Sequence, residues 1–67
     1  MISAPNQLVG TIEEISLGNV MAHIVVRVGN NVIESVITKR SAEQMGLKKG
    51  DQVTAIVKAT EVMIQKG

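Results

Sequence analysis

The fold is decided by the stretch Val20-Met21-Ala22-His23-Ile24-Val25-Val26-Arg27-Val28. One face of this stretch carries Val20, Ala22, Ile24, Val26 and Val28, and the other carries Met21, His23, Val25 and Arg27. Alternation with period two is typical of a β-strand, in which successive side chains point to opposite faces. Because apolar residues lie on both faces, we expect this strand to need cover on two sides.

Further strands are predicted on both sides of this one. Before it, a strand runs from Leu8 to Ile15, and Gly10 within it indicates a bulge or a close backbone approach. Gly18-Asn19 predicts the turn between the two strands, since both residue types tolerate a positive φ. Gly29-Asn30-Asn31 predicts a second hairpin turn. The remaining strands are predicted at Val32 to Thr38, Gln52 to Lys58 and Val62 to Gln65.

The period of two breaks after Thr38, where a short helix is predicted at residues 41–46. Ser41-Ala42-Glu43-Gln44 has the form of a capping box with Ser41 as the N-cap, and Gly46 is suited to end the helix in a left-handed conformation. Five strands with one helix between the third and fourth are typical of a small barrel of the oligonucleotide/oligosaccharide-binding type. We therefore predict an all-β fold, in one domain spanning residues 1–67.

The chain of 67 residues is short for a domain that folds alone. Chains below roughly 70–80 residues rarely gain more than about 3–5 kcal/mol from one core. The sequence has no Cys and only one His, which excludes a disulfide and a Cys/His zinc site as extra sources of stability. Self-association remains, and the exposed edges of a small sheet are templates for pairing with another chain. We therefore expect an oligomer.

Charge and composition argue against two kinds of partner. The net charge is only +1 and Phe, Tyr and Trp are absent, whereas nucleic-acid binders carry basic patches and stack bases on aromatic rings. The interior apolar runs, such as Ile24-Val25-Val26, are far too short to span a membrane. The first residues, Met1 to Asn6, lack the pattern of a signal peptide. We expect a cytoplasmic protein that contacts neither nucleic acid nor membrane.

The sequence contains no constellation that predicts catalysis. His23 is the only imidazole, and its place between Met21 and Val25 favours a partly buried strand histidine over a catalytic base. Glu13 and Glu14 are adjacent, so on a strand they point to opposite faces and cannot form a carboxylate pair. We expect a binding protein and not an enzyme.

Small hydrogen-bond donors gather near both ends of the expected sheet. Ser3 and Asn6 precede the first strand, Thr38 and Ser41 flank the start of the predicted helix, and Lys58 ends the fourth strand before Ala59 and Thr60. Hydroxyls, backbone N–H groups and an ammonium suit a compact anion, and a helix N-terminus near Ser41 adds favourable partial charge. Spacing alone leaves ordinary caps and turns as the alternative role for these residues.

Three segments resemble the molbindins, the small Mop-type molybdate-binding proteins with a TOBE-like domain. They are Ser3-Ala4-Pro5-Asn6-Gln7-Leu8-Val9-Gly10 at the start, Ile37 to Ser41 with Gly46 to Gly50 in the middle, and Thr54 to Ile64 at the end. The resemblance covers essentially the whole chain. It implies a five-stranded barrel that assembles as a homohexamer, a trimer of dimers, and holds molybdate or tungstate between subunits. The implied role is oxyanion storage and homeostasis.

The resemblance also implies which residues bind. Ser3, Lys58 and the N–H of Ala59 are expected from one subunit, and Thr38 and Ser41 from its neighbour, with Asn6 and Thr60 as further candidate donors. The family has an Arg in the opening motif where this chain has Pro5, which has neither a side-chain donor nor an N–H. Arg40 is our candidate for the missing cation.

Two other functions stay open at this point. Residues 46–53 are similar to a stretch of the swapped-hairpin AbrB-type transition regulators, which bind DNA with basic strands. The loss of the family's Arg at Pro5 also leaves room for an oligomeric scaffold of the same fold without a ligand.

Overall fold

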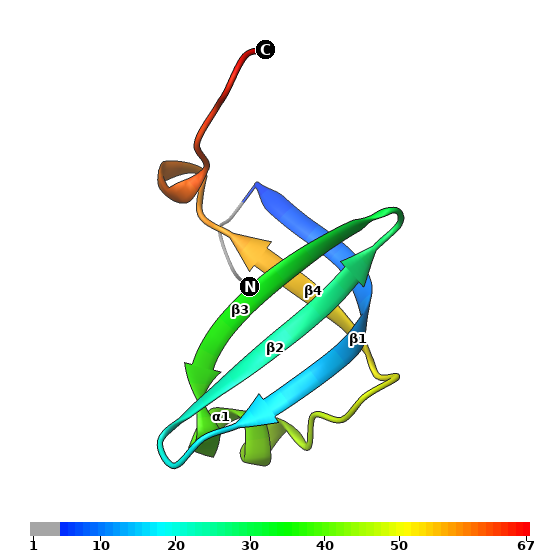
Figure 1. Ribbon diagram of the computed structural model, residues 1–67, viewed down its shortest axis with the longest axis vertical. Helices are drawn as coiled ribbons and strands as arrows, with labels where there is room; N and C mark the ends of the chain where they lie inside the picture. Colours follow the sequence, from blue (N-terminus) through cyan, green and yellow to red (C-terminus); the bar gives the residue numbers. More distant parts are fainter. Residues whose placement is uncertain (1–4) are drawn as a thin grey trace.

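The computed structural model describes residues 5–67 and consists of one strongly curved antiparallel sheet with a short helix below it (Figure 1). Its elements are β1 (Asn6–Leu17), β2 (Met21–Val28), β3 (Asn31–Thr38), α1 (Lys39–Met45), β4 (Gln52–Val57) and the 3₁₀ turn η1 (Ala59–Glu61). The strand order is β3-β2-β1-β4. The prediction of an all-β fold with a helix between the third and fourth strands is confirmed. Neither helix within the described range is long and apolar enough to cross a membrane.

Strand β1 belongs to both halves of the sheet because it bends beside Gly10. Residues up to Thr11 pair with β4, and residues from Thr11 onward pair with β2. A Cβ on Gly10 would lie 2.5 Å from the carbonyl oxygen of Arg27, closer than side-chain carbons come to backbone atoms. The predicted close approach at Gly10 is confirmed, and it lets β1 lie tightly against β2 at the corner.

A β-bulge follows the corner, where the register of β1 against β2 shifts between Ile12 and Glu14. Glu13, the residue in between, accepts two hydrogen bonds from Arg27 of β2, at 2.8 Å from Nε and 3.1 Å from the terminal guanidinium nitrogen. The pKa of Arg27 is raised above its ordinary value, mainly by the hydrogen bond to Glu13 and next by the negative charge of the Glu13 carboxylate. Both side chains are exposed, so this ion pair contributes little to stability. It joins the bulged residue of β1 to the neighbouring strand β2.

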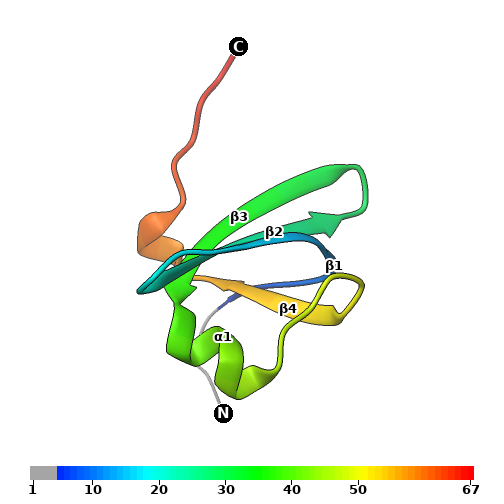
Figure 2. The ribbon, with the colours of Figure 1, turned by 60° about the horizontal axis from the view of Figure 1, so that its bottom comes forward.

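The core lies on the concave face of the sheet, and α1 packs against one end of it (Figure 2). The buried apolar side chains are those of Ile12, Ala22, Ile24, Val26 and Ala42. Three of them form the inward face that the alternation from Val20 to Val28 predicts. Around them pack only partly buried residues, among them Ile37, Leu47 and Val53. The core is therefore small, as expected for a chain of this length.

The two hairpin turns differ in how far they match the sequence. Between β2 and β3, Gly29 has a φ of 60°, as the Gly-Asn pair predicts. Between β1 and β2, the predicted turn at Gly18-Asn19 is confirmed, but it does not use the positive φ that both residue types tolerate, since neither is among the positive-φ residues of the described chain. Instead, the Gly18 N–H donates to the Met21 carbonyl at 2.8 Å, and the chain reverses through Asn19 and Val20.

Helix α1 begins earlier than its capping-box pattern predicts. The N-cap is Thr38, whose Oγ1 accepts a hydrogen bond from the Ser41 N–H at 3.1 Å, so the prediction of Ser41 as the N-cap is wrong. Thr38 and Ser41 have the same spacing as Ser41 and Gln44, and the end of β3 places the Thr hydroxyl first. Gly46 closes the helix in the left-handed region, with φ 64° and ψ 36°, as predicted.

The predicted fifth strand, from Val62 to Gln65, is not formed in the described residues. After β4 the chain makes the turn η1 and then leaves the sheet as an extended segment, drawn orange to red in Figure 1. Met63 and Ile64 are 93% and 89% exposed. The apolar residues at positions 62–64 find no partner strand within the described chain. Without a fifth strand, no backbone hydrogen bond joins β3 to β4 anywhere in residues 5–67, and the sheet is not closed into a barrel.

Candidate functional site

The predicted binding residues fall into two groups at opposite ends of the sheet. Thr38, Arg40 and Ser41 lie where β3 ends and α1 begins. Asn6 pairs with Val57, so it lies beside the segment from Lys58 to Thr60 that follows β4. Figure 1 shows the two regions at opposite ends of the molecule, with α1 at the bottom and η1 at the top left. A single chain therefore does not bring these two groups of predicted donors together. Ser3, the remaining predicted donor, lies outside the described residues.

At the first end, the Thr38 and Ser41 side chains form a coupled pair. The Thr38 hydroxyl donates to Ser41 Oγ at 2.8 Å, while Thr38 Oγ1 accepts from the Ser41 N–H. In this arrangement the Ser41 hydroxyl hydrogen has no acceptor among the described residues. The pair can therefore offer one hydroxyl donor outward while both side chains stay fixed by the helix start.

The cap gives a stability prediction. Thr38→Val removes the oxygen that accepts from the Ser41 N–H, so we expect a loss of about 1 kcal/mol. For a domain of this size, that corresponds to a fall in melting temperature of about 4–8 °C. Thermal unfolding at fixed protein concentration measures the change. Thr38→Ser keeps the oxygen and should retain most of the stability; an equal loss in both variants would contradict the capping role.

An open groove of about 530 Å³ lies beside the Thr38–Ser41 pair. It is lined by Asn19, Val20, Thr38, Lys39, Arg40 and Glu43. Arg40 is exposed and has no ion-pair partner in the described part of the chain. Lys39 is a second cation that sequence reasoning missed, although its place between Thr38 and Arg40 was a usable signal. The groove thus has two cations and the single carboxylate of Glu43 on its walls.

At the second end, the segment from Lys58 to Val62 contains some donors that are used within the turn η1 and others that have no acceptor in the described residues. The Glu61 N–H donates to the Lys58 carbonyl at 2.9 Å, and the Val62 N–H donates to the Ala59 carbonyl at 3.3 Å. The N–H groups of Ala59 and Thr60 and the Lys58 ammonium have no partner within residues 5–67. Glu61 brings one carboxylate into the same turn.

Each end therefore offers donors that suit an anion, and neither resembles a metal site. No group of three or more His, Cys, Asp or Glu side chains gathers in the described chain. His23 lies on the outer face of the sheet, where its Nε2 is 2.7 Å from Glu34 Oε1, and it is only partly exposed. The expectation of a partly buried strand histidine is confirmed.

Comparisons with known proteins point to one family. Residues 2–64 match the model of the TOBE domain. The chain is 45% identical over 64 residues to molybdenum-pterin-binding protein 2 of Clostridium pasteurianum, covering 94% of each chain. Among solved structures, it is similar to a molybdate-binding protein from Sporomusa ovata, with a TM-score of 0.94 at 42% identity over 98% of both chains. It is also similar to MopII from Clostridium pasteurianum, with a TM-score of 0.92 at 43% identity over 98% of this chain and 100% of that one.

Fold, donor groups and matches together define the class as a ligand-binding module and not an enzyme, as expected from the sequence. The chain belongs to the TOBE-domain family and, within it, to the small Mop-type proteins that its three segments resemble.

Proposed function

We propose that this protein binds molybdate or tungstate as a homo-oligomer and holds each dianion in the seam between two subunits. One subunit contributes the Lys58 end, with Ser3, Asn6 and the N–H groups of Ala59 and Thr60. Its neighbour contributes the other end, with Thr38 and Ser41. The observation that carries this proposal is the separation of the two donor groups within one chain, because each end alone holds only part of the donors that a tetrahedral oxyanion needs.

The chemistry of the two ends favours this class of ligand. A tetrahedral dianion has four oxygens that accept hydrogen bonds and nothing to donate, so it needs hydroxyl and N–H groups rather than carbonyls. The Ser41 hydroxyl and the Ala59 and Thr60 N–H groups are of this kind, and they lack protein acceptors in the described chain. The Lys58 ammonium adds a charge-assisted hydrogen bond, which is about twice as strong as a neutral one.

The relatives are named for molybdenum-pterin or molybdate binding, and the proposal extends this ligand to the present chain. The cellular role that we propose is storage and homeostasis of the oxyanion in the cytoplasm, by a single domain over residues 1–67. We propose a homohexamer built as a trimer of dimers, the assembly that the resemblance implies.

Arg40 is the residue that we propose as the substitute cation. The family's opening motif has an Arg where this chain has Pro5. Arg40 lies between Thr38 and Ser41 and lines the groove beside them. We expect Arg40→Gln to weaken molybdate binding about tenfold, because a charge-assisted contact becomes a neutral one. Isothermal titration measures this, and Lys49→Gln, in the exposed turn before β4, controls for net charge. Equal dissociation constants in wild type and Arg40→Gln would reject Arg40 as the substitute cation.

The proposal is tested directly by native mass spectrometry with and without molybdate, which reports subunit count and bound ligand together. We expect an oligomer that carries about one oxyanion or more per chain. A ligand that binds only the folded assembly stabilises it by about 2.7 kcal/mol at a hundredfold excess over the dissociation constant. The melting temperature should therefore rise by about 10 °C or more.

An oligomer that takes up neither molybdate nor tungstate, and whose melting temperature they leave unchanged, would favour the ligand-free scaffold instead. A salt-dependent shift of duplex DNA would favour the regulator, because phosphate contacts give steep salt dependence. Either result would overturn oxyanion binding as the function.

A further inference from the structure

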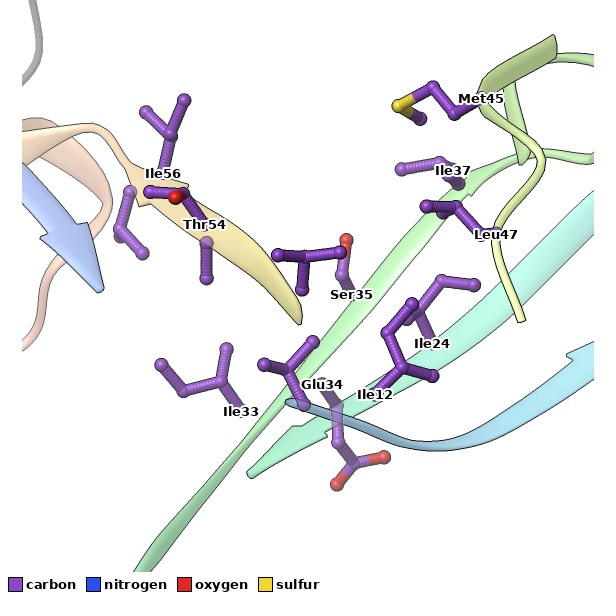
Figure 3. Close-up of a pocket in the computed structure, with 14 residues that line it drawn as sticks. Ile12, Ile24, Ile33, Glu34, Ser35, Ile37, Met45, Leu47, Thr54 and Ile56 are labelled. Carbon is purple, nitrogen blue, oxygen red and sulfur yellow. The ribbon is translucent and has the colours of Figure 1, made fainter. Parts of the chain in front are cut away.

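Two hollows on the described surface differ in charge. One lies between the edges of β3 and β4 and is lined mainly by isoleucine, valine and other apolar side chains (Figure 3). The other is the groove at the start of α1, with Lys39, Arg40 and Glu43 on its walls. Complementary charge selects a partner and fixes its register, whereas apolar surface alone is less selective. The charged groove is therefore the one whose occupant can be inferred.

The cations of this groove have no counter-charge within the described chain. The two ion pairs of residues 5–67 join neighbouring strands, and neither includes a residue of α1. Lys39 is half-buried, and its N–H donates to the Val20 carbonyl at 2.7 Å, so its backbone is held against the turn between β1 and β2. Lys39 and Glu43 are four residues apart but form no ion pair, and lysine before glutamate is the less favourable order on a helix. Lys39 is thus a positioned cation that lacks a carboxylate.

The turn η1, at the other end of the molecule, has the opposite imbalance. The Glu61 side chain is exposed, and its carboxylate has no partner in residues 5–67. It belongs to the same turn as the Ala59 and Thr60 N–H groups, which the proposed function assigns to the oxyanion. A carboxylate without a counter-ion beside a bound dianion disfavours binding, because like charges repel. Lys58 cannot balance Glu61 while it also balances the oxyanion, so a second cation is needed at this end.

We propose that Glu61 of each subunit forms an ion pair with Lys39 of the partner subunit across the seam. The inference rests on the proposed function, from which it takes only that η1 of one copy meets the start of α1 of another. Lys58 and Arg40 then remain for the oxyanion, and their two positive charges match its two negative ones. Glu61 touches no ligand in this arrangement. It is a positioning residue that fixes how the two ends meet.

The pair belongs to the assembly rather than to the ligand. An ion pair on an open surface contributes little, but close charge pairs within an interface couple more strongly. Arg40 is the competing partner for Glu61, yet using it there would leave the oxyanion only Lys58, since Pro5 offers no cation. Pairing Lys39 with Glu61 is the arrangement that keeps two cations for the dianion.

Carbodiimide crosslinking of the wild-type protein tests the contact directly, because it joins an ammonium and a carboxylate only where the two groups touch. Isotopically heavy and light chains are refolded together and crosslinked with and without molybdate. We expect peptides that join Lys39 of one isotope to Glu61 of the other, as detected by mass spectrometry. The two residues lie at opposite ends of a single chain, so a crosslink within one chain is not expected (Figure 1). Absence of the mixed crosslink under both conditions would overturn the proposal.

A charge exchange reads the contribution of the pair to assembly. Lys39→Glu and Glu61→Lys should each raise the subunit dissociation constant by about tenfold or more, because each places two like charges together in the seam. The double variant restores opposite charges, so its dissociation constant should return to within about threefold of wild type. Sedimentation at equal ionic strength measures all four proteins, and circular dichroism checks that each is folded. The control combines Glu61→Lys with Lys49→Glu, which reverses a lysine in the exposed turn before β4 and should not restore assembly.

The outcomes separate this inference from the proposed function. A double variant that assembles no better than the single variants would overturn the pairing and leave oxyanion binding in the seam untouched. Single variants that assemble like wild type would do the same. Restored assembly in a protein that takes up no molybdate would support the pairing and count against the proposed ligand alone. A wild-type protein that is monomeric with and without molybdate would overturn both the pairing and the shared seam.

Discussion

Replacing Lys58 with glutamine is expected to weaken molybdate binding by about 30-fold to 100-fold. The Lys58 ammonium stands at the end of β4 with no partner in the described chain, next to the N–H groups of Ala59 and Thr60 that also lack acceptors. A hydrogen bond to a charged group contributes about 1.5–3 kcal/mol, and a loss of about 2–2.8 kcal/mol within this range gives the expected factor. Isothermal titration of the wild-type and variant oligomers at equal ionic strength measures it.

The matched control for Lys58→Gln is Lys66→Gln, which removes the same charge from the exposed C-terminal segment. Size-exclusion chromatography must show the same subunit count for both variants, so that a loss of binding is not a loss of assembly. Should Lys58→Gln bind as tightly as Lys66→Gln, the Lys58 end of the molecule would not be part of the oxyanion site.

Replacing Gly10 with alanine is expected to destabilise the fold by about 3 kcal/mol or more, at the upper end of what an added methyl group costs in a packed site. The new Cβ would lie 2.5 Å from the Arg27 carbonyl oxygen, 2.8 Å from a methyl group of Val26 and 2.9 Å from one of Val28. The nearest of these atoms belongs to the backbone of β2 and cannot rotate away. Urea unfolding followed by circular dichroism measures the loss, which approaches the whole stability of a core this small.

Thr11→Ala, at the next and exposed position of β1, is the control and should change stability by no more than about 0.5 kcal/mol. A Gly10→Ala variant as stable as this control would mean that β1 does not approach β2 as closely as the structure describes.

The sequence predicts the sheet well because its signals are local. The alternation, the turn at Gly29 and the helix end at Gly46 each act within a few residues. The structure confirms the last two and confirms the alternation from Met21 to Val28, while Val20 lies in the turn before β2 and is exposed. The N-cap was misplaced because two overlapping pairs, Thr38–Ser41 and Ser41–Gln44, fit the same capping pattern. What separates them is the end of β3, which depends on pairing with Met21, distant in sequence.

The residues of the candidate site were predictable from the sequence, but their arrangement in space was not. Donor chemistry alone selected Thr38, Ser41 and Lys58, and only the strand registers reveal that the chain holds them at opposite ends. The same limit applies to residues 62–65, where the sequence predicts a strand without saying which sheet it joins. The spacing of apolar residues predicts which face of a segment is buried. It does not predict which element covers that face, because that element lies elsewhere in the chain or in another chain.

The separation of the two donor groups has a genetic consequence. If each binding seam takes Lys58 from one copy and Ser41 from another, a chain defective at one end and a chain defective at the other can complement. In a mixed population of Lys58→Gln and Ser41→Ala chains, some seams combine two intact ends, so activity absent from either parent returns when they are expressed together. A defective allele in such a protein is partly masked by a second, differently defective one.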